Sequence, residues 1–123
     1  MKVPALILRQ LYTFGSLAND ADGVVFGLKN RRSDATLLRV ERITVDGEDV
    51  PLDQVRLELR DGTWRKATGL SPENALSFPL KNTVRLHLKG LRLAEGKHEL
   101  GIAFDSDPFG KLRFTVADSI STD

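Results

Sequence analysis

The sequence contains no cysteine among its 123 residues. Disulfide bonds, thiol catalysis and cysteine-based metal sites are therefore all excluded. Histidine is scarce as well, and the two that are present, His87 and His98, each lie inside an alternating strand pattern. A zinc or manganese site needs three or four converging ligands, which two isolated histidines do not supply. We interpret His87 as a surface residue and His98 as a strand-end residue that bonds a neighbour, and we expect no metal site and no catalytic residue on this chain.

The chain also has almost no net charge, because 18 basic residues oppose 17 acidic ones and leave +1. A protein that binds nucleic acid electrostatically needs a basic stripe, which this balance argues against. The only local basic cluster is formed by Lys29, Arg31 and Arg32. Because Asp34 and Asp46 lie close by, we interpret this cluster as a solvated turn.

No apolar run approaches the ~20 residues that cross a bilayer. The N-terminal apolar run is interrupted by Arg9 and Gln10, is too short for the core of a signal peptide, and is followed by no small-residue cleavage site. We therefore expect a cytoplasmic protein with no membrane contact. The length and the 41% hydrophobic content fit one packed domain over 1–123.

Helical periodicity is missing from every segment of ten or more residues. Apolar and polar residues alternate instead over 23–30, 55–59, 83–90 and 97–104, which is typical of antiparallel strands with one solvated face. Over 36–45 the apolar positions are first Leu38 and Val40 and then Ile43 and Val45. This slip of one residue predicts a β-bulge near Glu41 and Arg42.

Turn residues separate these segments at short intervals. The Asp-Gly pairs at 46–47 and 61–62 predict hairpins, because both residue types tolerate a positive φ. Only residues 50–56 fit a single helical turn. We predict an all-β fold, an antiparallel β-sandwich or a closely related barrel with seven to nine short strands.

Two acidic turns hold the remaining candidate ligands. One contains Asp105 and Asp107, the other Asn19, Asp20 and Asp22. Neither has the ligand spacing of an EF-hand loop, so we interpret both as strand-end turns. The chain also lacks a glycine-rich phosphate loop and a nucleophile elbow.

The first 17 residues are rich in apolar side chains before the first clear strand. Such a segment either forms an edge strand of the sandwich or contacts a partner chain, since an exposed apolar edge promotes aggregation. The apolar residues are Val3, Leu6, Ile7, Leu8, Leu11, Tyr12, Phe14 and Leu17.

The stretch "FDSDPFGKLRFTV" at 104–116 places Phe109 near the tip of an acidic turn. Asp107 and Pro108 precede the ring and form a polar, rigid turn, which we expect to lift Phe109 away from the strands. Phe114 shares a face with its apolar neighbours two residues away, as does Leu100, so both are predicted to lie in the core.

Several stretches together resemble the small beta subunit of bacterial C-glycoside deglycosidases. They are "LYTFGSLAND", "GVVFGLKNRRSDATL", "ITVDGEDVP" and "GKHELGIAFDSDPFGKLRFTVADSI", which cover roughly 11–52 and 96–120. The markers of the resemblance are F-x-L-K-N-R, V-D-G and P-F-G-x-L-x-F-x-V-x-D.

This resemblance implies a β-sandwich accessory subunit bound to a larger TIM-barrel alpha subunit in a hetero-oligomer. The complex would be a carbon–carbon lyase that separates a 3-oxo-glucosyl unit from a flavonoid-type aglycone. The catalytic base and a divalent metal, expected to be manganese, would belong to the alpha subunit. No cofactor is expected on this chain.

The resemblance also suggests a role for Phe109, as an anchor for a partner pocket or a cover for an aromatic aglycone. The alternative is that the ring folds back over its own sandwich end. The predicted interface or active-site rim consists of Phe109, Pro108, Asp107, Tyr12 and Phe14. Two other functions stay open at this point: a free-standing carbohydrate-binding or adaptor sandwich without an enzymatic partner, and a small metal-dependent enzyme.

Overall fold

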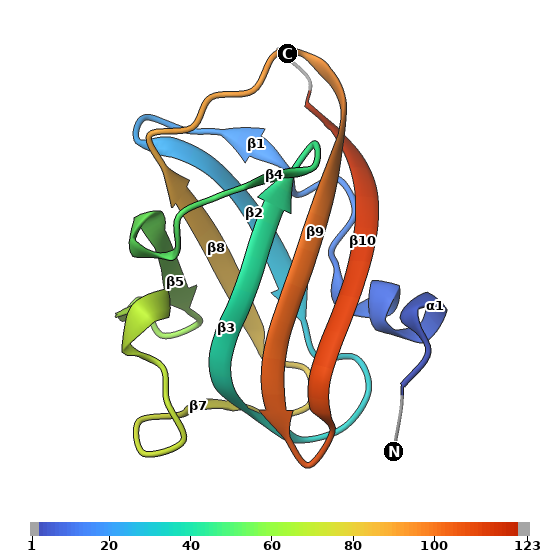
Figure 1. Cartoon of the computed structure of the whole chain (residues 1–123), viewed down its shortest axis with the longest axis vertical. Coiled ribbons are helices and arrows are strands. Elements are labelled where there is room, and N and C mark those ends of the chain that lie inside the picture. The colour runs from blue at the N-terminus through green and yellow to red at the C-terminus, as the bar shows by residue number, and fades with distance from the viewer. Residues whose placement is uncertain (1–2, 121–123) are drawn as a thin grey trace.

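Two antiparallel sheets face each other in the computed structural model, which describes residues 3–120 (Figure 1). Sheet A contains, in spatial order, β1 (Ala18–Asn19), β2 (Gly23–Lys29), β8 (Thr83–Lys89), β5 (Val55–Leu59) and β6 (Trp64–Lys66). Sheet B contains β10 (Gly110–Ile120), β9 (Gly96–Asp107), β3 (Ala35–Val45) and β4 (Glu48–Asp49), and β7 (Leu76–Phe78) also pairs with β3. The predicted all-β antiparallel sandwich is confirmed. The described residues form ten strands where seven to nine were predicted, because four of the ten have only two or three residues and show no alternating pattern.

Helical structure is confined to short pieces in the described part of the chain. They are the α-helix α1 (Ala5–Leu8) and the 3₁₀ turns η1 (Arg9–Leu11), η2 (Leu52–Gln54) and η3 (Ala67–Gly69). The turn η2 lies within the segment 50–56 that was predicted to hold a helical turn. Over residues 3–120 no helix has the length and the apolar composition needed to cross a bilayer.

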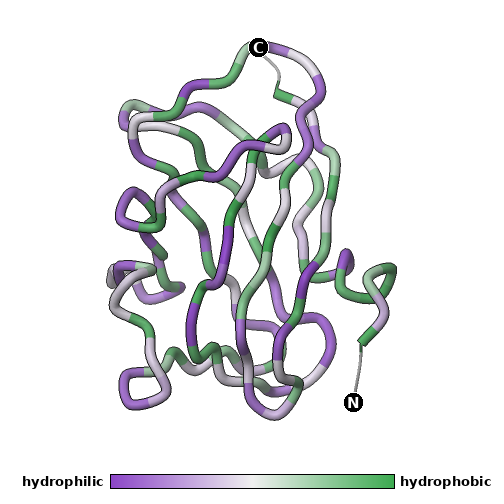
Figure 2. Tube along the Cα trace, viewed as in Figure 1, coloured by the Kyte–Doolittle hydropathy of each residue, from purple (hydrophilic) through white to green (hydrophobic). Residues whose placement is uncertain are grey.

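The core lies between the two sheets and follows the alternation of the sequence. Green and purple segments alternate along the long strands in Figure 2, as expected for strands with one buried face. Leu100 on β9 is fully buried and Phe114 on β10 is 2% exposed, so both predicted core positions are confirmed. The inward side chains of sheet A include Phe26, Leu86 and Leu57, which are adjacent in the strand register.

Strand β3 contains two irregularities. Its pairing with β9 shifts between Val40 and Arg42, at the predicted bulge, and again between Leu37 and Arg39. The second shift places Leu37 in the core, whereas Leu38 is only half-buried. The sequence pattern had grouped Leu38 with Val40, because an alternating pattern cannot show two closely spaced shifts.

Both Asp-Gly pairs form the predicted hairpin turns. Asp46 and Gly47 join β3 to β4 with φ values of 52° and 84°. Gly62, with a φ of 89°, lies in the turn between β5 and β6. The left-handed backbone conformation of Asp46, Gly47 and Gly62 favours Asp or Gly at these three positions.

Residues 3–17, called the arm below, close the edge of the sandwich between β10 and β2. The arm lies beside β10 in Figure 1, with α1 at the outer side of the molecule. The side chain of Arg9 donates to the carbonyl of Thr115 at 2.8 Å, and the N–H of Thr13 donates to the carbonyl of Gly27 at 3.0 Å. Residues 1–2 of the expected arm lie outside the described residues.

The arm buries part of its apolar surface within the chain itself. Leu8, Leu11, Tyr12 and Leu17 are each 6% exposed or less. Arg31, interpreted from sequence as part of a solvated turn, donates hydrogen bonds to the Gln10 and Tyr12 carbonyls and to Thr13 Oγ1. Its guanidinium therefore holds the arm in place.

Candidate functional site

The outer face of sheet A carries a cluster of charged and aromatic side chains. Its composition follows from the register, because directly opposed residues of neighbouring strands point to the same face. Glu58 on β5 faces Arg85 on β8 and Trp64 on β6. His87 on β8 faces Arg56 on β5. Residues far apart in the sequence thus meet on one surface.

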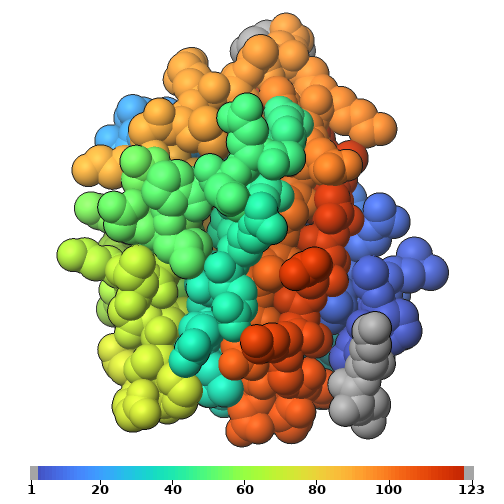
Figure 3. All heavy atoms as spheres, in the orientation of Figure 1, coloured from blue at the N-terminus to red at the C-terminus, as the bar shows by residue number. Residues whose placement is uncertain are grey.

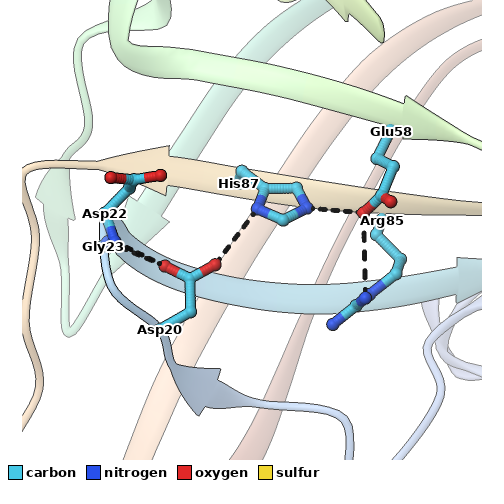
Figure 4. Close-up of polar contacts among 6 residues, drawn as sticks. All are labelled: Asp20, Asp22, Gly23, Glu58, Arg85 and His87. Atoms are coloured by element: carbon cyan, nitrogen blue, oxygen red, sulfur yellow. Dashed lines mark hydrogen bonds and ion pairs between the residues drawn. The ribbon is translucent and has the colours of Figure 1, made fainter. Parts of the chain in front are cut away.

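His87 lies at the centre of this cluster, between two carboxylates (Figure 4). Its Nε2 atom is 2.9 Å from Glu58 Oε1, and its Nδ1 atom is 3.4 Å from Asp20 Oδ2. Arg85 Nη1 lies 3.7 Å from the same Glu58 oxygen. The guanidinium of Arg85 offsets part of the negative charge of Glu58, and the imidazole contacts both carboxylates.

Asp20 is held in place by the turn before β2. Its Oδ1 atom accepts the backbone N–H groups of Asp22 at 3.0 Å and Gly23 at 2.9 Å. Burial acts to raise the pKa of this carboxyl, but these two hydrogen bonds and the nearby His87 outweigh it, so the pKa lies below its usual range. Gly23 is required here, because a Cβ atom would lie 2.0 Å from the carbonyl oxygen of Leu88.

Trp64, the only tryptophan of the chain, forms one wall of a hollow on this face. Its side chain is 50% exposed, and its ring centroid lies 4.6 Å from that of His87 with the planes tilted by 58°. The hollow has a volume of about 240 Å³, and Arg56, Lys89 and Asp22 also line it. A partly exposed ring fixed beside cations is suited to binding a ligand.

The cluster combines carboxylates and cations with an imidazole and an indole ring. Within residues 3–120 no group of three or more His, Asp or Glu residues could hold a metal ion. Asp20 and Glu58 already contact His87, and the described part of the chain places no serine or threonine hydroxyl within hydrogen-bond distance of either histidine. The cluster thus holds Glu58, Asp20 and the Trp64 ring in fixed positions around His87, and none of its hydrogen bonds among the described residues activates a serine or threonine hydroxyl as a nucleophile.

A second surface surrounds α1. One hollow, of about 220 Å³, lies between the arm and the end of the sandwich, where Ile7, Phe78 and Phe109 line it. A wider hollow, of about 770 Å³, lies on the other side of α1 against β9 and β10. Between them the side chain of Leu6 is 73% exposed. Figure 3 shows the arm in blue as a ridge along this side of the molecule.

The predicted site residues fall at two different places. Asp107 and Pro108 are exposed at the turn between β9 and β10, and Phe109 is half-buried beside them. Tyr12 is buried, with 2% of its side chain exposed, whereas Phe14 is 61% exposed and packs edge-on against Tyr12 at a centroid distance of 5.1 Å. Whether any of these five residues contacts a partner stays a prediction.

The structure differs from the sequence expectation in the position of the Phe109 ring. The ring packs against the core and lines the smaller hollow beside α1, so the turn does not lift it clear of the strands. Gly110, with a φ of 75°, and the hydrogen bond from Ser106 Oγ to the Gly110 carbonyl at 3.0 Å fold the turn back.

Tyr12 has a structural role that sequence reasoning missed. Its hydroxyl donates to Asp118 Oδ2 at 2.7 Å, and the N–H of Gly15 donates to the same oxygen at 2.9 Å. Burial, together with the bond to Asp118, raises the pKa of the Tyr12 phenol. Burial acts to raise the pKa of Asp118, but the bonds from Tyr12 and from three backbone N–H groups lower it below its usual range.

Sequence reasoning also missed Trp64 and Arg56, two residues of the hollow on sheet A. One signal was available: the lone tryptophan lies two residues after the Asp-Gly pair at 61–62, on the returning strand of a predicted hairpin. No local signal places Arg56 beside His87, because that neighbourhood depends on the pairing of β5 with β8.

A family model described as "Hydroxymethylglutaryl-CoA reductase, N-terminal domain" matches residues 7–121, nearly the whole chain. A search of curated protein sequences finds no significant match.

The family match overturns the resemblance to the beta subunit of C-glycoside deglycosidases, which was wrong, and with it cleavage of 3-oxo-glucosyl flavonoids. No finding supports the alternative of a free-standing carbohydrate-binding or adaptor module. The markers misled because they reflect features of the fold. The Asp and Gly of the V-D-G marker form a turn, and the Gly of the P-F-G marker has a positive φ. The Asn of the F-x-L-K-N-R marker is buried Asn30, whose amide donates to the Ser33 and Phe78 carbonyls. Such features recur in unrelated sandwiches. The chain belongs to the family of the hydroxymethylglutaryl-CoA reductase N-terminal domain.

Proposed function

We propose that this chain is a non-catalytic accessory domain that docks on the catalytic part of an enzyme of the hydroxymethylglutaryl-CoA reductase class. The family description supports this proposal, because it refers to one domain of a larger enzyme. The chemistry of the surface agrees with it, since the charged cluster on sheet A lacks an activated nucleophile.

The observation that carries the proposal is the ridge formed by α1. Within residues 3–120 Leu6 is the most exposed of the large apolar side chains, and hollows lie on both sides of the helix. The hydrogen bonds of Arg9, Thr13 and Tyr12 fix the base of the ridge. A preorganised apolar ridge loses little conformational freedom on binding, which favours its burial in a partner.

The proposal keeps the expectation of a larger partner that carries the catalytic groups. The expectation of a TIM-barrel partner with a divalent metal rested on the wrong resemblance and stays a prediction without a supporting observation. A cytoplasmic location likewise stays a prediction from the sequence.

Leu6→Asp tests the docking surface. The substitution places a charge at the centre of the ridge, so we expect the free energy of association with the catalytic part to become less favourable by about 2 kcal/mol or more, the scale of an interface hot spot. Isothermal titration calorimetry with the separately purified catalytic part of the reductase measures this change. Phe109→Ala should weaken association as well, and should also lower stability by about 1–2 kcal/mol because its ring is half-buried.

Leu80→Asp is the matched control, since Leu80 is also exposed, at 44%, but follows β7 and lines neither of the hollows beside α1. It should leave the dissociation constant unchanged. Equal affinities of the wild type and Leu6→Asp, or no association of the wild type at all, would contradict the docking proposal.

A further inference from the structure

The smaller hollow beside α1, of about 220 Å³, reaches the hydrophobic core. It lies at the end of the molecule that carries β7 and the β9–β10 turn (Figure 1). The arm, the loop after β2, and strands β3, β7, β9 and β10 form its wall. Leu11 of the arm and Phe104 and Leu112 of sheet B line it, and each is 7% exposed or less. The hollow therefore has an apolar wall that is already packed in place.

The two buried polar side chains of this wall are already hydrogen-bonded. The amide nitrogen of Asn30 donates to the Ser33 and Phe78 carbonyls, both at 2.7 Å. Its Oδ1 atom accepts two backbone N–H groups of the same loop. Ser106 Oγ donates its proton to the Gly110 carbonyl at 3.0 Å. Because these donors are occupied, the inner part of the hollow is suited to an apolar group.

Within residues 3–120, Arg32 is the only charged residue that lines this hollow, and its guanidinium forms no ion pair with a described residue. Arg32 is exposed, so its charge lies at the mouth. Asp34 follows on the same loop, but it does not line the hollow and accepts the N–H of Leu80 at 2.8 Å. One guanidinium without a partner matches one carboxylate, which it binds through two parallel hydrogen bonds.

The size of the hollow limits the length of a ligand. A closed apolar cavity of about 150 Å³ holds a benzene ring. On the same basis, a hollow of about 220 Å³ has room for roughly eight carbon atoms.

We propose that this hollow binds a small apolar carboxylic acid, with the hydrocarbon part against Leu11, Phe104 and Phe109 and the carboxylate on Arg32. The inference goes beyond docking, because it concerns a small molecule and needs no partner chain. It also gives the half-buried ring of Phe109 a second role, as one wall of a ligand site.

Octanoate is the probe, and two-dimensional nitrogen–proton NMR of the full chain is the measurement. We expect saturable shifts of the amides of Ala35, Phe109 and Leu112, which line the hollow, with a dissociation constant of about 1 mM or below. The amide of His87, on sheet A, should not shift. Octan-1-ol, which keeps the chain and lacks the charge, should bind about tenfold more weakly.

The length of the acid tests the size of the hollow. Burial of one methylene group strengthens binding about fourfold, so hexanoate should bind about tenfold or more weakly than octanoate. Beyond about ten carbon atoms the affinity should stop rising, because the hollow is then filled. Affinity that continued to rise as far as dodecanoate would indicate nonspecific adsorption and would overturn the proposal.

Variants separate the contributions of charge and space. Arg32→Gln should weaken octanoate binding about tenfold, because it removes the charge at the mouth. Arg39→Gln is the matched control, since Arg39 is also exposed but lies on β3 and does not line the hollow. Ala35→Leu should weaken binding about tenfold as well, because the larger side chain fills part of the hollow. Thermal unfolding checks that each variant is folded.

Three further outcomes would overturn the proposal. They are no saturable shift up to about 5 mM octanoate, equal affinities for octanoate and octan-1-ol, and equal effects of Arg32→Gln and Arg39→Gln. None of them bears on docking, because Leu6, whose substitution tests docking, does not line this hollow.

Discussion

Leu100 and Phe114 show how single side chains determine the inward face of sheet B. Phe114 lies opposite Ile102, and Leu100 lies opposite Val116, so each pair adds two buried side chains to the same core. Cross-strand apolar pairs of this kind are the main local stabilisation of an antiparallel sheet. The next residue along β10, Thr115, is exposed.

Phe114→Ala should lower the free energy of unfolding by about 3–5 kcal/mol, the usual cost of truncating a large buried side chain. Thr115→Ala serves as the control and should change it by at most about 0.5 kcal/mol. Urea denaturation followed by circular dichroism measures both. A loss below about 1 kcal/mol for Phe114→Ala would contradict its place in the core.

At the scale of elements, the carboxylate of Asp118 joins the arm to β10, in addition to the hydrogen bond from Arg9 to the Thr115 carbonyl. Asp118 Oδ2 accepts hydrogen bonds from the Tyr12 hydroxyl and from the N–H groups of Gly15 and Leu17. One side chain on β10 thus fixes three points of the arm, and the arm in turn supports α1. The orientation of the docking ridge depends on this contact.

Tyr12→Phe removes the hydroxyl and leaves the ring in place. We expect a loss of about 1–2 kcal/mol in stability, because the partly buried Asp118 loses one of its donors. Hydrogen exchange of the amides of Gly15 and Leu17 should become faster, whereas that of Ile102 in the sheet should follow only the change in global stability. Unchanged exchange in the arm would show that Asp118 does not hold it.

At the scale of the whole molecule, His98 connects the β3–β4 turn to the segment before β9 at one end of the sandwich. Its Nδ1 atom lies 2.7 Å from Asp46 Oδ2 in the β3–β4 turn, and its Nε2 atom lies 2.7 Å from the Ala94 carbonyl before β9. Both neighbours are acceptors, so both ring nitrogens donate only when the imidazole is protonated. The hydrogen bond to Asp46, followed by that to Ala94, raises the pKa of His98.

Stability should therefore depend on pH in a defined way. The contribution of His98 is fully present below its unfolded pKa of about 6.5 and is lost as pH rises through its higher folded pKa. The pKa of Asp46 is lowered, first by the N–H of Glu99 and then by His98. Its contribution is present above about pH 3.9 and is lost as pH falls through the lower folded pKa.

Thermal unfolding from about pH 3 to 9 tests this dependence. The wild type should be most stable between about pH 4 and 6.5 and should lose stability on either side. His98→Gln and Asp46→Asn should both reduce the loss of thermal stability at alkaline pH. Asparagine is chosen at position 46 because it tolerates the positive φ of this turn. An alkaline decline of the same slope in His98→Gln would assign the effect to other groups.

Local patterns in the sequence determined the long strands, the two Asp-Gly hairpins and the bulge near Glu41, because these depend on neighbours within a few residues. They also determined the inward faces, except at Leu37 and Leu38. Tertiary structure alone decided what lies beside what. His87 meets Asp20 and Glu58, and Tyr12 meets Asp118, only through the strand order and register. The half-buried position of Phe109 depends on core residues from distant segments, against which its ring packs. These contacts join residues far apart in the chain, and a strand pattern is compatible with many pairings. The sequence thus predicted the fold class, while the hollow beside Trp64 and the ridge at α1 emerged only from the packed molecule.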